Sequence, residues 1–108
     1  MSIQLAEFVQ AVGSFSSTGG DTGLREVGAE SARTGVGTYT LTLDNPLNAA
    51  DGFIMLTPRA AALGAGIGYS VTHTTDTIKT INVVNGAGAP LDAGMDYMVF
   101  RLTPNLNG

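Results

Sequence analysis

The sequence predicts an all-β sandwich, and three observations point to it. Short segments in which apolar and polar residues alternate recur at roughly ten-residue spacing, which is typical of sandwiches and barrels. Turn-forming residues separate these segments, and fifteen of the 108 residues are glycine. No segment has the apolar spacing of a helix longer than about two turns. A chain of this length without cysteine suffices for one domain with a core of its own.

The first third of the chain has the weakest pattern. Residues 8–15 are compatible with a strand, and residues 26–33 with either a strand or a short turn of helix. Between them, residues 14–21 are small and polar, which is typical of a loop or hinge. We therefore expect residues 1–20 to form an N-terminal arm and hinge, and residues 21–108 to form the folded domain.

The clearest strand covers residues 38–43, where Tyr39, Leu41 and Leu43 alternate with threonines. Such alternation with a period of two is typical of a strand with one buried face. The next candidate, residues 53–57, is a continuous apolar run that ends before a proline. This run predicts a strand buried on both faces.

The remainder of the chain predicts a hairpin and a last strand. Residues 59–63 have helix propensity but are too few for more than one turn. Residues 67–84 alternate again around a turn at Asp76 and predict a β-hairpin, and residues 85–90 form a turn cluster. In residues 95–103 both alternating sets of side chains are bulky, so we expect this strand to be central in its sheet.

Charge and hydropathy exclude two classes of partner. Five basic against nine acidic side chains give a formal net charge of −4. Nucleic-acid affinity comes largely from clustered Lys and Arg, so we expect no nucleic-acid partner. The first residues lack the basic and apolar segments of a signal peptide, and no window approaches the roughly 18 apolar residues of a membrane span, so we expect no membrane partner. Low charge with abundant glycine favours surfaces that meet other protein copies.

The residues that could carry catalysis or bind metal do not form a recognisable site. His73, the one histidine, has Ser70 and Asp76 three residues away on either side, but positions 70 and 73 of a strand point to opposite faces. One histidine without cysteine is too little for zinc. Asp92 and Asp96 flank turns, where aspartate commonly caps backbone N–H groups, so an acid–base pair is the less favoured interpretation. We expect no catalytic residue, no metal and no cofactor.

An apolar set precedes the predicted hinge and has two interpretations that we weigh equally. The set is an arm that buries itself on a partner, or it is an ordinary first strand or short helix of the same domain. Its members are Ile3, Leu5, Phe8, Val9 and Val12.

Residues 33–43 have the sequence RTGVGTYTLTL. This R-x-G-x-G-x-Y-x-hydrophobic-x-hydrophobic pattern resembles the opening of small jelly-roll domains in phage structural proteins. Residues 69–74, 80–88 and 92–102 are similar to the closing strands of that family, with its glycine turn and aromatic last strand. The resemblance covers about residues 33–102. It implies a tumour-necrosis-factor-like jelly roll that assembles as a homotrimer and holds or decorates a particle.

Among proteins of this kind, we expect a capsid decoration (cement) protein, made in the host cytoplasm, that binds the major capsid protein on the outer head surface and stabilises the shell. We expect Ile3, Leu5 and Phe8 to contact the capsid. For packing within the trimer, the expected residues are Tyr97, Val99 and Phe100.

Two alternatives stay open at this point. The first is a receptor-binding tip or fibre module that contacts the host surface through loops 59–66 and 86–94. The sequence contains no stalk, coiled coil or Gly-X-Y repeat, which favours decoration over a fibre tip. The second alternative, which is the least favoured, is a small enzyme that acts on polysaccharide through Asp92 and Asp96.

Overall fold

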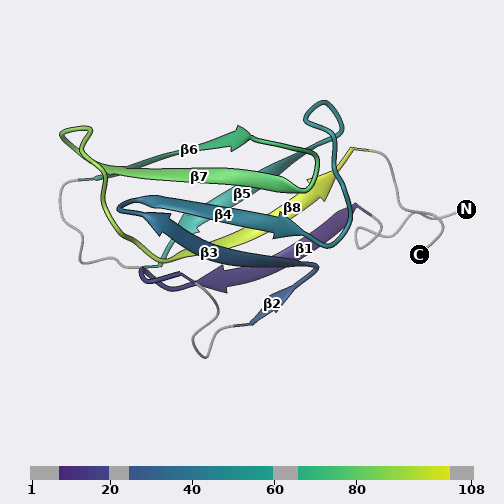
Figure 1. Cartoon of the computed structure of the whole chain (residues 1–108), viewed down its shortest axis with the longest axis horizontal. Coiled ribbons are helices and arrows are strands. Elements are labelled where there is room, and N and C mark those ends of the chain that lie inside the picture. Colours follow the sequence, from purple (N-terminus) through teal and green to yellow (C-terminus); the bar gives the residue numbers. More distant parts are fainter. Residues whose placement is uncertain (1–7, 20–24, 60–65, 103–108) are drawn as a thin grey trace, which may run out of the picture.

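The computed structural model describes residues 8–19, 25–59 and 66–102 of the chain. All regular structure in these residues is β, arranged as two four-stranded antiparallel sheets that pack face to face (Figure 1). The predicted all-β sandwich is confirmed, and the described residues form eight strands. In chain order the strands are β1 (Val9–Phe15), β2 (Glu26–Val27), β3 (Ala29–Gly35), β4 (Thr38–Leu43), β5 (Gly52–Pro58), β6 (Ile67–His73), β7 (Ile78–Asn85) and β8 (Met95–Arg101).

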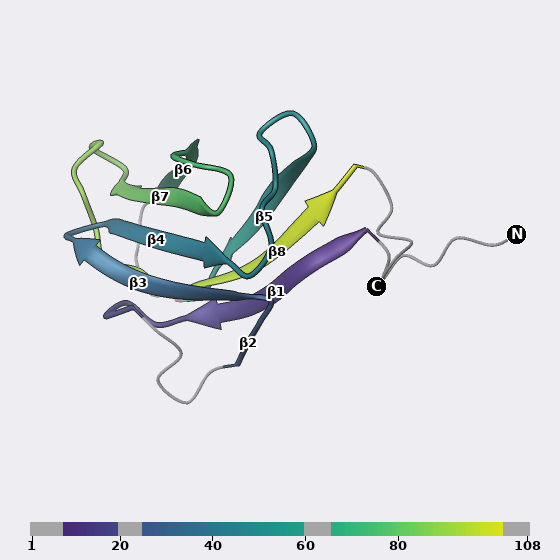
Figure 2. The ribbon, with the colours of Figure 1, turned by 45° about the vertical axis from the view of Figure 1, so that its right-hand side comes forward.

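The chain passes repeatedly between the two sheets. The first sheet has the strand order β2-β1-β8-β5, and the second has the order β3-β4-β7-β6. Hairpins join β3 to β4 and β6 to β7 within the second sheet. The connections from β4 to β5, from β5 to β6 and from β7 to β8 cross from one sheet to the other. The first and last strands are therefore neighbours in the middle of the first sheet, as Figure 2 shows.

A single glycine lets the chain turn from the first sheet into the second, between β2 and β3. Gly28 has a φ of 83°, in the left-handed region that favours glycine. A Cβ atom at this position would lie 2.5 Å from the carbonyl oxygen of Gln10 in β1. Another residue would therefore strain the backbone and collide with β1, so this corner requires glycine.

The core lies between the sheets and follows from the alternation of each strand. In β4, Tyr39, Leu41 and Leu43 are buried as predicted. Phe15 of β1 packs against Tyr39 from the opposite sheet, with the two ring centroids 4.6 Å apart. The other buried apolar side chains are Ala11, Ala29, Leu47, Leu56, Ile81, Val83, Ala93, Met95, Tyr97 and Val99.

Most of the expected strands are present, but one has a different environment. Residues 67–84 form the predicted hairpin, and residues 26–33 are strand rather than helix. The central position predicted for the last strand is confirmed, because β8 lies between β1 and β5. The expectation that residues 53–57 are buried on both faces is wrong. Phe53 and Met55 point away from the core, to the outer side of the first sheet, and are exposed.

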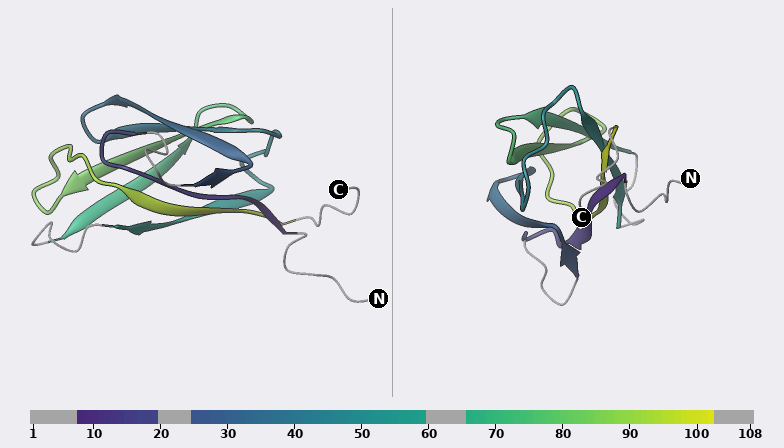
Figure 3. Two further views of the ribbon diagram at one scale, coloured as in Figure 1. Left: turned by 90° about the horizontal axis from the view of Figure 1, so that it is seen from below. Right: turned by 90° about the vertical axis from the view of Figure 1, so that its right-hand side faces the viewer.

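The expected division between arm and domain at residue 20 also needs correction. β1 pairs with β8 from Val9 to Phe15, and the two strands lie side by side in Figure 3. Ala11 and Phe15 contribute to the core, so β1 belongs to the sandwich. Any arm is confined to residues that precede this strand. The helical turn expected at 59–63 falls, apart from residue 59, outside the described residues.

Candidate interaction surfaces

The outward side of the first sheet is apolar. Directly opposite residues on neighbouring strands point to the same face of a sheet. Met98 on β8 lies opposite Val12 on β1 and Met55 on β5. Phe100 lies opposite Phe53, and their rings stack with centroids 5.1 Å apart. Met55 is 57% exposed and Phe53 48%. We call this surface the apolar face; its side chains are Val9, Val12, Val27, Phe53, Met55, Met98 and Phe100.

The outward side of the second sheet is mostly polar, with Ile78 and Val84 on β7 as apolar exceptions. Thr80 on β7 lies opposite Thr40 on β4 and Thr72 on β6. The hydroxyl groups of Thr80 and Thr74 form a hydrogen bond of 2.6 Å. We call this surface the polar face; its side chains are Thr38, Thr40, Ser70, Thr72, Thr80 and Asn82. The two outer surfaces of one sandwich therefore differ sharply in polarity.

The three residues expected in the trimer interface lie on opposite sides of the first sheet. Tyr97 is 3% exposed and Val99 is fully buried, because both point into the core. The Tyr97 hydroxyl donates a 2.6 Å hydrogen bond to the Glu26 carboxylate within the same chain. Neither side chain can therefore pack against another copy, and their assignment to the interface is corrected. Phe100 alone of the three belongs to the apolar face, where Met98 and Phe53 are the neighbours that sequence reasoning missed.

The expected capsid contact concerns residues that the structure describes only in part. Ile3 and Leu5 lie outside the described residues. Phe8 is half-buried, and its carbonyl accepts a 2.7 Å hydrogen bond from the backbone N–H of Arg101. This bond ties the beginning of β1 to the end of β8. The capsid contact of these three residues stays a prediction.

A polar cluster adjoins the apolar face. Asp96 lies opposite Ser14 and Thr57, one pair beyond Met98 on the outward side. Its carboxylate accepts 2.6 Å bonds from the Ser14 hydroxyl and from the Arg59 guanidinium. The Ser14 hydrogen bond, together with Arg59, lowers the pKa of Asp96 below its ordinary value. The cluster is therefore a compensated ion pair at the border of an apolar surface.

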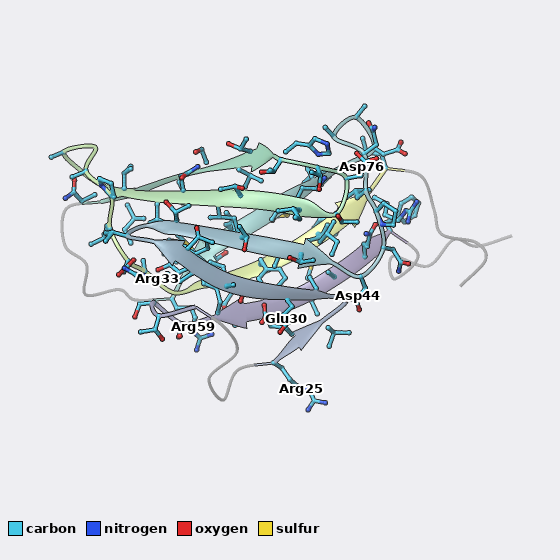
Figure 4. All side chains as sticks on the ribbon, viewed as in Figure 1. Arg25, Glu30, Arg33, Asp44, Arg59 and Asp76 are labelled. Carbon is cyan, nitrogen blue, oxygen red and sulfur yellow. The ribbon has the colours of Figure 1, made fainter. Side chains whose placement is uncertain are left out.

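Asp92 belongs to a separate network. It accepts hydrogen bonds from Arg33 at 3.0 Å and from the backbone N–H of Gly37 at 2.8 Å, and the Arg33 bond is the main cause that lowers its pKa. Figure 4 shows Arg33 and Arg59 at the same end of the sandwich. A general acid needs a raised pKa, whereas Asp92 and Asp96 are both held ionised. Nowhere in the described ranges do three His, Asp or Glu side chains gather as a metal site.

The side of the sandwich between β5 and β6 contains a cavity of about 360 Å³. Lys79, only 4% exposed, lies at one end of it. Its ammonium donates to the carbonyls of Leu47 at 2.6 Å and Thr75 at 3.0 Å, and contacts His73 Nδ1 at 2.5 Å. Burial lowers the pKa of Lys79. The cavity is lined by Leu47, Asn48, Ala49, Gly52, Phe53, Ile54, Val71, His73 and Lys79.

His73 and Lys79 together connect the loop that contains Leu47 to the turn that contains Thr75 and Asp76. His73 Nε2 lies 3.3 Å from the Asp76 carboxylate, so the imidazole lies between Lys79 and Asp76. Three partners match the three N–H donors of a lysine ammonium. Both ring nitrogens of His73 therefore have polar partners within the chain. Sequence reasoning missed Lys79, although its spacing from the inward residues Ile81 and Val83 places it on the buried side of β7.

The described part of the chain contains no helix long and apolar enough to cross a membrane. Comparisons of the chain with family models, with curated proteins and with solved structures find no match. The role of these surfaces therefore has to follow from their own geometry and chemistry.

Proposed function

We propose that this protein is a structural component of a phage virion: a homotrimeric jelly-roll protein that decorates the outer surface of the head and stabilises the shell. The observation that carries the proposal is the apolar face. Monomeric proteins rarely expose a large contiguous apolar surface, and such surfaces commonly mark protein interfaces. The chain places seven apolar side chains there in two adjoining rows, including two stacked aromatic rings.

The strand order supports a jelly roll of the kind that the sequence resembles. The last strand lies beside the first, β4 lies beside β7, and the connections β2–β3, β4–β5, β5–β6 and β7–β8 cross between the sheets. Crossing connections of this type are characteristic of Greek-key sandwiches, to which the jelly roll belongs. The number of copies, three, comes from the resemblance of residues 33–102 to trimeric phage jelly rolls.

The chemistry of the apolar face supports a second copy as its partner. Interfaces between permanently associated subunits are more hydrophobic than the rest of the surface and resemble a core cut in half. Met98 and Phe100 lie at the centre of the sheet, and the Asp96–Arg59 pair at their border is already compensated within the chain. Because this ion pair is already compensated, a partner that covers the apolar face does not have to bury an unpaired charge there.

Trimer formation supplies the mechanism of decoration. A rigid trimer presents three identical weak contacts that engage the capsid at the same time. Their combined affinity can therefore exceed that of a single contact by about 10² to 10⁴. A trimer that spans neighbouring capsid subunits holds them together without catalysis. The proposal includes no cofactor, metal or nucleic acid.

The test combines the mass in solution with capsid binding. We expect light scattering to give about 33 kDa, three times the 11.0 kDa chain mass, and we expect the trimer to sediment with empty phage heads. Met55→Lys introduces a charge on the apolar face and should give an 11.0 kDa monomer that no longer sediments with heads. Thr72→Lys places the same charge on the polar face and should leave the trimer intact.

Three outcomes would contradict the proposal. A monomeric native protein would exclude the trimer. A Met55→Lys variant as trimeric as Thr72→Lys would exclude the apolar face as the interface. A trimer that binds host cells and ignores heads would favour the alternative function, a receptor-binding tip or fibre module.

A further inference from the structure

We infer that the side of the sandwich between β5 and β6 accepts a β-strand from a neighbouring copy, namely residues 2–6, with Ile3 and Leu5 in the cavity. This inference rests on the self-association that the proposed function requires, and it goes further by naming a second contact between copies. It also gives Ile3 and Leu5 a partner other than the capsid.

The inner surface of β6 is incompletely covered. Tyr69 and Val71 lie opposite Val83 and Ile81, which are fully buried, so all four side chains point toward the interior of the sandwich. Tyr69 is nevertheless 45% exposed and Val71 39%. Among the strands that the structure describes, the first sheet ends at β5, so none of them continues that sheet beyond β5 over β6. The 360 Å³ cavity beside Val71 is a consequence of this open side.

The two edge strands that border the cavity carry no Lys, Arg, Asp or Glu. Exposed edge strands generally carry charged residues that prevent pairing with another chain. β5 and β6 are both seven residues long. On the opposite side of the sandwich, β2 is two residues long and contains Glu26, and β3 contains Glu30 and Arg33. The uncharged side is therefore the one suited to accept a strand.

The backbone of β5 is oriented for pairing. The Leu56 carbonyl accepts a 3.0 Å hydrogen bond from the Tyr69 hydroxyl, so it points away from β8 toward the free edge. Backbone groups of residues two apart in a strand point the same way. The N–H and carbonyl of Ile54, which lines the cavity, therefore also face the free edge. An added strand could bond to Ile54 while its inward side chains enter the cavity.

Residues 2–6 have the composition of such a strand. Ile3 and Leu5 alternate with Ser2, Gln4 and Ala6, and none of the five carries a charged side chain. This matches an uncharged acceptor that offers apolar contacts on one side and backbone groups along its edge.

The segment also leaves the sandwich at the correct end. Phe8 is bonded to Arg101, and Arg101 lies opposite Gly52, which lines the cavity. Within one chain, however, a segment that leaves β1 must pass β8 and β5, three strand spacings or about 14 Å, to reach the free edge of β5. That path consumes about four residues at about 3.3 Å each, which leaves at most residues 2–4 to pair along β5 of the same chain. A neighbouring copy imposes no such path, and the exchange can close into a ring.

The test uses the absence of native cysteine. A chain with Leu5→Cys is mixed with a chain with Val71→Cys, the two are unfolded and refolded together, and the sample is then oxidised. We expect a disulfide-linked heterodimer on a non-reducing gel. The control replaces Val71→Cys with Thr72→Cys, whose side chain lies on the polar face of the same strand. The control should give at least tenfold less of the cross-linked product.

The outcomes distinguish a failure of the strand exchange from a failure of the proposed function. Light scattering on the same samples reports whether the trimer forms. A trimer that yields no cross-link, or yields equal cross-linking in the control, overturns the strand exchange and leaves the trimer standing. When both substitutions are in one chain, a disulfide formed only within that chain overturns the exchange as well. A monomeric sample overturns the strand exchange together with the proposed trimer.

Discussion

The two outer surfaces of this sandwich are built from the same kind of strand and have opposite chemistry. On the polar face, threonine hydroxyls repeat along β4, β6 and β7. On the apolar face, valine, methionine and phenylalanine occupy the equivalent outward positions of β1, β5 and β8. An antiparallel sheet commonly has one face in the core and one in solvent. The second sheet follows that rule, whereas the first sheet has apolar side chains on both faces.

In our proposal the first sheet has two packing partners, of which the described part of the chain supplies one. Phe15 meets Tyr39 of the second sheet inside the sandwich, with centroids 4.6 Å apart. Phe53 and Phe100 make a similar aromatic pair on the outer surface, which no second layer covers within residues 8–19, 25–59 and 66–102. The second partner of the first sheet is, in our proposal, another copy of the chain.

The largest expected effect compares the two aromatic pairs. Phe15→Ala removes a fully buried ring and should lower the free energy of unfolding by about 3 to 5 kcal/mol. Phe53→Ala removes a half-exposed ring and should cost about 1 kcal/mol or less when assembly is prevented. Both are measured by urea denaturation in a Met55→Lys background. Equal losses would show that the outer pair is already packed within a single chain.

A smaller effect is expected when a hydroxyl group is removed, and the loss can be compared between Tyr97 of the first sheet and Thr80 on the polar face. Tyr97→Phe removes the hydroxyl that donates to the Glu26 carboxylate, and it should cost about 1.5 to 3 kcal/mol. Thr80→Val removes a hydroxyl of the polar face, whose hydrogen bond to Thr74 is exposed, and it should change stability by about 0.5 kcal/mol or less. Thermal unfolding of the two variants checks the order. A larger loss for Thr80→Val would contradict the solvent-facing role of the polar face.

Alternation along single strands was sufficient to predict much of the fold. It identified Tyr39, Leu41 and Leu43 as one buried set because threonine occupies the other set, so only one face can enter the core. In the last strand the same rule separates the set of Tyr97 and Val99 from the set of Met98 and Phe100. It cannot say which set is inward, since both are bulky.

The three residues predicted for one trimer interface do not share a face of the sheet, and the alternation rule explains why. Val99 and Phe100 are adjacent in a strand, so they point to opposite faces and cannot share one interface. The apolar run of β5 is equally ambiguous. Whether its outward residues Phe53 and Met55 are covered depends on whether another layer packs over that side of the sheet, and a single strand's sequence does not contain that information. The burial of Lys79 could have been predicted from the sequence, because Lys79 alternates in phase with the inward residues Ile81 and Val83 of β7.

The smallest effect concerns the ion pair beside the apolar face. Asp96 has a pKa below the ordinary value of 3.8, mainly through its Ser14 hydrogen bond. The unfolded chain therefore binds more protons near this pH, so the stabilisation from Asp96 is complete above pH 3.8 and disappears as the pH falls through the lower folded value. Asp96→Asn should reduce the loss of thermal stability between pH 7 and pH 3, by a small amount since Asp96 is half-exposed. Asp44→Asn, which removes the same charge elsewhere, should retain the native loss. If Asp96→Asn and Asp44→Asn reduced the loss of stability equally, the change in net charge would explain the effect. The contacts of Asp96 with Ser14 and Arg59 would then contribute nothing specific to the stability of the folded chain.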